Sequence, residues 1–176
     1  MEAEQMLEWG MVRDRAVAHL RQCGHIDISK HRPQAQYLIL PSFADSIAVD
    51  IVRSKDELAA YLTHWRQTSD IEAFATPVVR LKHPTPFIPS YDSARIAIPD
   101  DQLDSLLNQM AATRINLSPT TNSISVDGTS YELSSGRAYT GIRLQWHNQL
   151  PADWSVLSPV VDAFQAMATS TVSRAT

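Results

Sequence analysis

The segment from Val126 to Leu157 constrains the fold more than any other part of the sequence. It begins Val-Asp-Gly-Thr, continues through the apolar and polar residues of 142–146, and ends with Leu-Pro-Ala-Asp-Trp at 150–154. An Asp-Gly pair between alternating runs is a strong hairpin signal. A proline followed by an acidic residue suits the first turn of a helix. We therefore predict a hairpin turning at Asp127-Gly128, a strand over 139–146 and a C-terminal helix.

The C-terminal helix carries an apolar stripe that a proline interrupts. Residues at helical spacing form this stripe: Trp154, Leu157, Val161 and Phe164. A proline inside a helix removes one hydrogen bond and clashes with the preceding turn. We expect Pro159 to kink the helix or to restart it with Ser158 as the cap.

Residues 2–23 are expected to form an N-terminal helix that stops at Gly24. Apolar residues that can share its buried face are Met6, Leu7, Ala16, Val17 and Leu20. Gly10 weakens the middle of the helix, so a break near it is the alternative.

Two apolar runs, 37–40 and 46–52, follow this helix, and the second alternates with the period of a half-buried strand. We predict that they pair as a hairpin through 42–45. Ser54 then stands three residues before Glu57, which is a capping-box pattern. It predicts a helix reaching about Gln67, with its buried stripe formed by Leu58, Leu62 and Trp65.

Five of the ten prolines fall between Pro77 and Pro99. Residues 78–81 and 94–98 can form strands, but the proline spacing between them excludes a helix or a central strand. We expect 83–89 to be a stiff loop that displays Phe87 and Ile88. A helix follows from Asp100, with its amphipathic stripe formed by Leu103, Leu106, Leu107 and Met110.

This order of elements predicts an α+β fold, a mainly antiparallel sheet with about four helices packed largely on one face. We expect a single domain over residues 1–168 and a frayed polar tail over 169–176.

The composition excludes several classes of function. The net charge of −4 argues against a nucleic-acid-binding surface, since phosphates require clustered Lys and Arg. No apolar run is long enough to span a membrane, and the acidic N-terminus is unlike a secretory signal. The single cysteine cannot form an internal disulfide, so a cytoplasmic location is expected.

The sequence shows no recognisable catalytic device, and we predict no cofactor and no metal site. The six histidines lack metal-ligand spacing, although His25 and His31 in one polar connection remain a weak metal-pair alternative. Cys23 lies at an expected helix C-terminus, where the dipole disfavours a thiolate, so a buried structural role is preferred. Asp100, Asp101 and Asp104 are interpreted as charges that complement a helix N-terminus.

The C-terminal segment resembles a group of small bacterial proteins. In that group, Asp-Gly-Thr-x-Tyr-Glu-Leu precedes a strand ending in Trp and then Pro-x-x-Trp-x-x-Leu. The matching positions here are Asp127, Gly128, Thr129, Tyr131, Glu132, Leu133, Trp146, Pro151, Trp154 and Leu157. Some proteins of this group are immunity partners of secreted bacterial toxins. Others have no assigned role, so the resemblance implies a fold but no active site.

The preferred hypothesis is a non-catalytic protein-binding module, specifically an immunity-type inhibitor that neutralises a bacterial toxin by direct contact. A mildly acidic surface could complement a basic partner. The candidate partner-binding residues are Trp9, Phe87, Ile88 and Asp92. Trp9 is included because an exposed tryptophan is a typical anchor, although core packing is its commoner role.

Two alternatives stay open. The first is an enzyme or small-ligand-binding protein with a site assembled around the C-terminal sheet from Tyr131, Glu132, Arg143 and His147. The second is a structural or regulatory subunit that forms a homodimer through an exposed sheet edge, as opposed to a monomer.

Overall fold

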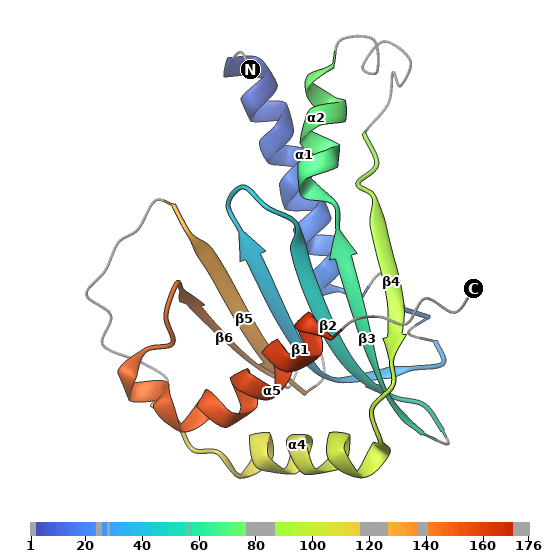
Figure 1. Ribbon diagram of the computed structural model, residues 1–176, viewed down its shortest axis with the longest axis vertical. Coiled ribbons are helices and arrows are strands. Elements are labelled where there is room, and N and C mark those ends of the chain that lie inside the picture. Colours follow the sequence, from blue (N-terminus) through green and yellow to red (C-terminus); the bar gives the residue numbers. More distant parts are fainter. Residues whose placement is uncertain are drawn as a thin grey trace.

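The computed structural model describes residues 3–23, 26–27, 29–55, 57–76, 87–116, 127–136 and 141–170. Their elements, in chain order, are α1 (Ala3–Arg21), β1 (Arg32–Pro41), β2 (Ser46–Arg53), β3 (Leu58–Trp65), α2 (Gln67–Ala75), β4 (Tyr91–Ile96), α4 (Asp100–Ala112), β5 (Thr129–Ser135), β6 (Ile142–His147), the 3-10 helix η1 (Ala152–Leu157) and α5 (Ser158–Thr169). The strands form one antiparallel sheet in the order β4-β3-β2-β1-β5-β6, shown in Figure 1. The predicted α+β class is thus confirmed.

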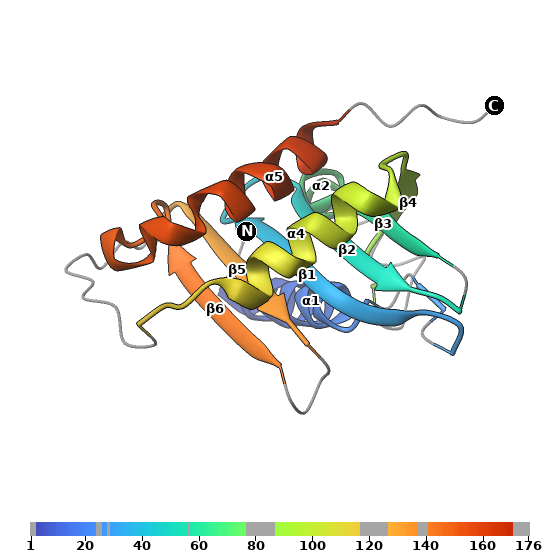
Figure 2. The same ribbon diagram turned by 90° about the horizontal axis from the view of Figure 1, so that it is seen from below.

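The helices are divided between the two faces of this sheet rather than gathered on one. Figure 2 shows α4 and α5 on one face and α1 on the other. Both faces of the middle strands are apolar, so each face requires its own cover. None of the described helices is both long and apolar enough to cross a bilayer.

The larger core lies between the sheet and α4, α5 and η1. Tyr37 of β1 is fully buried at its centre, with its ring 5.5 Å from Phe164 of α5 and 6.1 Å from Trp146 of β6. All four residues of the predicted 103–110 stripe pack into this core. The predicted helix start at Asp100 is confirmed, and its carboxylate also accepts a hydrogen bond from Leu58 N at 3.2 Å.

The second core lies under α1, where Trp9 stacks on Trp65 of β3 and tilts against Phe74 of α2. Helix α1 runs unbroken through Gly10. Its buried face differs from the predicted one, since Met6 and Leu7 are 60% and 71% exposed. The residues that meet the sheet are Trp9, Val12, Ala16, Val17 and Leu20.

The predicted helix over 54–67 is wrong, because Leu58–Trp65 is strand β3 and a helix begins only at Gln67. β3 pairs with β2 on one side and β4 on the other. The predicted hairpin of 37–40 with 46–52 is confirmed as β1 and β2. The expected strand over 94–98 is placed at Tyr91–Ile96, and the one over 78–81 lies outside the described residues.

The C-terminal segment folds partly as predicted. β5 pairs with β1 and β6, while the strand expected before Asp127 lies outside the described residues. The expected restart near Pro159 is confirmed, because η1 ends at Leu157 and α5 begins at Ser158 with a proline in its first turn. Ser158 is not the cap, since that position is occupied by Leu157. The tail after Ser170 is likewise outside the described part of the chain.

Candidate functional site

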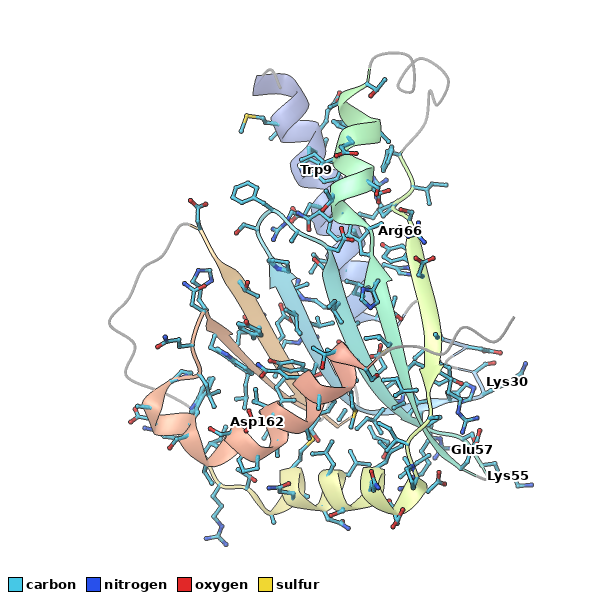
Figure 3. The ribbon with its side chains drawn as sticks, in the orientation of Figure 1. Trp9, Lys30, Lys55, Glu57, Arg66 and Asp162 are labelled. Atoms are coloured by element: carbon cyan, nitrogen blue, oxygen red, sulfur yellow. The ribbon has the colours of Figure 1, made fainter. Side chains whose placement is uncertain are left out.

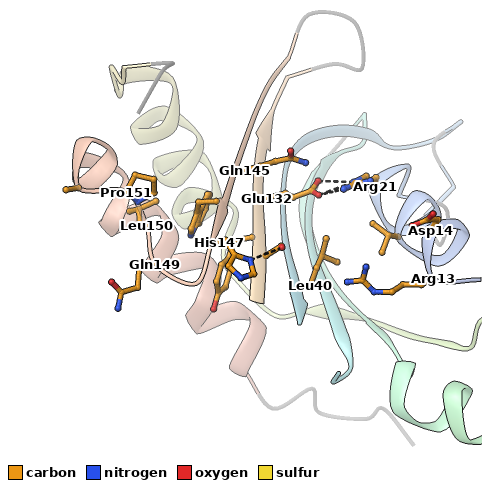
Figure 4. A pocket seen from close by; sticks show the side chains of 15 residues that line it. Arg13, Asp14, Arg21, Leu40, Glu132, Gln145, His147, Gln149, Leu150 and Pro151 are labelled. Atoms are coloured by element: carbon orange, nitrogen blue, oxygen red, sulfur yellow. Dashed lines mark hydrogen bonds and ion pairs between the residues drawn. The ribbon is translucent and has the colours of Figure 1, made fainter. Parts of the chain in front are cut away.

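A hollow of about 670 Å³ lies between α1 and the outer strands β5 and β6 (Figure 4). Helix α1 packs on β1, β2 and β3, so the same face of β5 and β6 lies beside the helix rather than beneath it. Three groups of residues line the hollow: Arg13, Asp14, Val17 and Arg21 from α1; Leu40, Ser130, Tyr131, Glu132, Gln145, Trp146 and His147 from strands; and 149–152 after β6.

Strand alternation makes the floor of the hollow polar. Glu132 stands opposite Gln145 in the register of β5 and β6, and Ser130 stands opposite His147. Directly opposite residues of an antiparallel pair share one face, and Glu132 reaches α1. The intervening residues Leu133 and Leu144 belong to the core on the other face.

Glu132 is the most buried charge of the hollow, with its side chain only 5% exposed. Arg21 of α1 binds it in a fork, donating from Nε to both carboxylate oxygens at 3.1 and 3.0 Å and from Nη2 to Oε1. The hydrogen bonds that Arg21 donates to Glu132 raise the pKa of Arg21, although partial burial opposes them. Arg143 approaches the same carboxylate from the solvent side, with Nε 4.0 Å from Oε2.

Ser130 and His147 form a second polar pair in the hollow. The Ser130 hydroxyl lies 3.3 Å from His147 Nδ1, and His147 Nε2 lies 3.2 Å from the carbonyl oxygen of Asp127. A carbonyl only accepts hydrogen bonds, so Nε2 carries the proton in the neutral ring. Nδ1 is then free to accept from the Ser130 hydroxyl.

Gly128 holds the turn beside this pair. Its φ is +141°, and an added Cβ would collide with Asn148 Oδ1 and with His147 Nε2. Gly128→Ala is expected to lower the free energy of unfolding by about 1–2 kcal/mol, through strain and displacement of both side chains. Urea denaturation followed by circular dichroism measures the change.

Gly10→Ala is the matched control, because Gly10 lies inside α1 with nothing within 4 Å of an added Cβ. It is expected to raise the free energy of unfolding by about 0.5–1 kcal/mol. Equal effects of the two substitutions would contradict the assigned role of Gly128.

The structure brings together the residues named for a site around the C-terminal sheet. Tyr131, Glu132 and His147 line the hollow, and Arg143 lies beside them at Glu132. The ring of Tyr131 turns to the core face, where it stacks on Trp146 at 5.6 Å. Sequence reasoning missed Arg13 and Arg21. Arg13 and Arg21 each lie four residues from Val17, a spacing that places all three on one face of a helix. This spacing was the signal by which the sequence could have identified them.

The candidate partner-binding residues lie elsewhere. Trp9 is 7% exposed between α1 and α2 (Figure 3), so the expectation of an exposed anchor is wrong for it. Phe87 is partly buried against Phe74, whereas Ile88 is 83% exposed. Asp92 is exposed and forms an ion pair with Arg66.

Cys23 is buried as predicted, with Sγ 3.1 Å from Asp50 Oδ1. Burial, followed by the nearby Asp50 charge, raises the pKa of its thiol well above the usual range. No group of three metal-ligating side chains occurs among the described residues, and His25 of the weak metal-pair alternative lies outside them.

No family model, curated protein or solved structure matches this chain.

Proposed function

We propose that this protein binds another protein through the hollow between α1 and the β5–β6 face. The observation that supports this is a polar, fixed surface: a forked Arg21–Glu132 pair, the Ser130–His147 pair and exposed Gln145 and Gln149 around one opening. Arginine forks and rigid polar groups at a rim are features of protein interfaces.

A protein surface fits this hollow better than a small molecule does. Small-molecule pockets are mostly apolar and enclose most of the ligand. Here charged and amide side chains from α1, β5 and β6 line an opening that faces solvent. The complementary surface is therefore expected to be broad and polar.

Photo-crosslinking tests the proposal in the cells that express the protein. A photoreactive residue at Asp14 or Gln149, both exposed at the hollow, is expected to capture one recurrent protein. Gln102 is the matched control, because it is exposed on α4 on the opposite face of the sheet. Capture that is equal from Gln102, or absent from both hollow positions, would overturn the proposal.

Immunity-type inhibition is the most specific form of this proposal, and it rests on the resemblance of the C-terminal segment. If it holds, the captured protein arrests growth when expressed alone, and co-expression of this chain restores growth. A captured protein that is harmless alone would remove the toxin-neutralising role while leaving protein binding intact.

The Ser130–His147 pair favours a second candidate, an enzyme that acts through a serine nucleophile. In that case a fluorophosphonate probe is expected to label Ser130, with His147 taking the hydroxyl proton, a new oxygen–phosphorus bond forming and fluoride leaving. Ser130→Ala is the control, and mass spectrometry of the intact chain is the measurement. Absence of labelling in the wild type counts against this candidate.

A further inference from the structure

Strand β6 is one edge of the sheet. Backbone hydrogen bonds at the ends of β5 show which residues of β6 bond to β5 and which face outward, an alternation that we call its hydrogen-bonding phase. Asn148 N donates to Thr129 O at 2.8 Å, which makes this a hydrogen-bonded position of the β5–β6 pair. On the other side of β5, Ser42 N donates to Gly128 O and Gly136 N donates to Gln34 O. Both observations give the same phase, because hydrogen-bonded positions alternate along an antiparallel pair.

This phase fixes which residues of β6 have free main-chain groups. Residues 142, 144 and 146 direct their N–H and C=O groups to β5. Arg143, Gln145 and His147 direct theirs away from the sheet, where no described strand pairs with them, and of these groups the carbonyl oxygen of His147 already accepts from Gln149 N at 2.7 Å. The edge therefore presents the N–H and C=O groups of Arg143 and Gln145, and the N–H group of His147, to an extended chain.

The side chains of these three residues lie on the face of the hollow. They stand opposite Ser134, Glu132 and Ser130, and Glu132 contacts α1. An added strand would place every second side chain on this same face, beside the hollow. Its intervening side chains would fall on the face of Leu144 and Trp146, near the exposed Ile142.

The charge around the edge is positive, although the whole chain carries −4. Arg13 and Arg21 line the hollow together with Asp14 and Glu132, and Arg143 lies 4.0 Å from Glu132, so three positive charges stand beside two negative ones. Within the cluster of Arg21, Glu132 and Arg143, it is Arg143 that makes the weakest contact. Its side chain is 50% exposed, and its Nε lies 4.0 Å from Glu132 Oε2. Arg143 lies on the edge strand itself and is half exposed, so it is available to a partner.

The other edge of the sheet is different. On β4, Asp92 is paired with Arg66, and Arg95 is paired with Glu57 at 2.9 Å. Charged side chains on an edge strand are a common protection against pairing. Of the two edges, β6 is the one whose charged side chain is not held in a close ion pair.

We propose that the protein partner contributes an extended segment that adds to the edge of β6, with an acidic side chain opposite Arg143. This inference rests on the proposed function and specifies how the partner is held. Main-chain hydrogen bonds supply the affinity in this mode of recognition, and alternate side chains supply the specificity.

A second copy of this chain fits the edge less well. In antiparallel pairing of two β6 strands, the outward residues meet one another, so Arg143 would face Arg143, Gln145 or His147 of the other copy. None of these is a carboxylate. Charge complementarity therefore favours a different, acidic segment.

The test uses a blocked eight-residue peptide of alternating Val and Glu, and its Val–Lys counterpart, as probes. The Val–Glu peptide is expected to shift the amide resonances of Arg143, Gln145 and His147 more than those of Leu144 and Trp146. Gln145→Pro removes one outward donor without breaking the β5 ladder, and it is expected to weaken binding by about tenfold. Gln145→Ala removes the same side chain but keeps that donor, so it is expected to weaken binding less than Gln145→Pro does.

Charge reversal supplies the second variant. Arg143→Glu is expected to lower the affinity for the Val–Glu peptide by about tenfold and to raise the affinity for the Val–Lys peptide. The proposal is overturned if Gln145→Pro binds as tightly as Gln145→Ala, if the amide shifts avoid the three outward positions, or if the wild type dimerises through β6 by light scattering. If a photoreactive residue at Gln149 still captures the partner in the Gln145→Pro variant, strand addition is refuted and protein binding through the hollow still stands.

Discussion

Arg21→Met is expected to lower the free energy of unfolding by about 2–3 kcal/mol. The substitution leaves Glu132 with its side chain 5% exposed and without its forked partner. An unpaired buried charge is strongly destabilising. Arg143 lies 4.0 Å from Glu132 and can move closer. The expected loss of stability is therefore smaller than for a buried carboxylate with no cation nearby. Urea denaturation at neutral pH, followed by circular dichroism, measures it.

A second substitution separates the charge from the packing. Glu132→Gln in the Arg21→Met background removes the carboxylate that has lost its partner, so most of the lost stability is expected to return. Arg143→Met alone is the matched control and is expected to cost less than about 0.5 kcal/mol, because that side chain is half exposed. A double variant as unstable as Arg21→Met alone would show that the lost packing of Arg21, not its charge, is the cause.

The wrong helix prediction over 54–67 has a physical explanation in strand β3. Only Tyr61 and His64 of its eight residues are partly exposed. α1 lies over one face of the sheet and α4 with α5 over the other, so apolar residues occur on both faces of this strand. Period-two alternation is lost in such strands, and Leu58, Leu62 and Trp65 then fit a helical period by chance.

The capping-box pattern was right about the hydrogen bond and wrong about the conformation. Glu57 N donates to the hydroxyl of Ser54 at 3.2 Å, as at a helix start. Ser54 N also donates to Glu57 O at 2.9 Å, which closes a tight turn between β2 and β3. A serine hydroxyl that accepts from the residue three positions later serves both structures.

Local patterns predicted the β1–β2 hairpin and the start of α4, because their signals lie within a few residues. They could not predict that β5 pairs with β1, nor that Arg21 meets Glu132 across 111 positions of sequence. The hollow depends on both. Tyr131, Glu132 and His147 of its strands were named from the sequence, whereas Ser130, Gln145 and the α1 residues required the fold.

The largest effect is expected for Trp65→Ala, at about 3–5 kcal/mol. Trp65 is the largest fully buried side chain and stacks on Trp9. Its Nε1 also donates to Asp70 Oδ2 at 2.8 Å. Domains are stable by only about 5–15 kcal/mol, so the variant is expected to be close to unfolding at 37 °C. Calorimetry measures this without relying on tryptophan fluorescence.

Asp70 separates the cavity from the lost hydrogen bond. Its carboxylate accepts from Trp65, from Ser90 N at 2.9 Å and from the Ser90 hydroxyl at 2.6 Å. Asp70→Asn can keep all three contacts, because the Ser90 hydroxyl can accept from the amide, and it is expected to cost less than about 1 kcal/mol. Trp65→Phe retains a ring but removes the indole donor, with an expected cost of about 1–3 kcal/mol. If Trp65→Phe is as damaging as Trp65→Ala, then the buried hydrogen bond to Asp70, rather than the packing against Trp9, is what fixes α2 to the sheet.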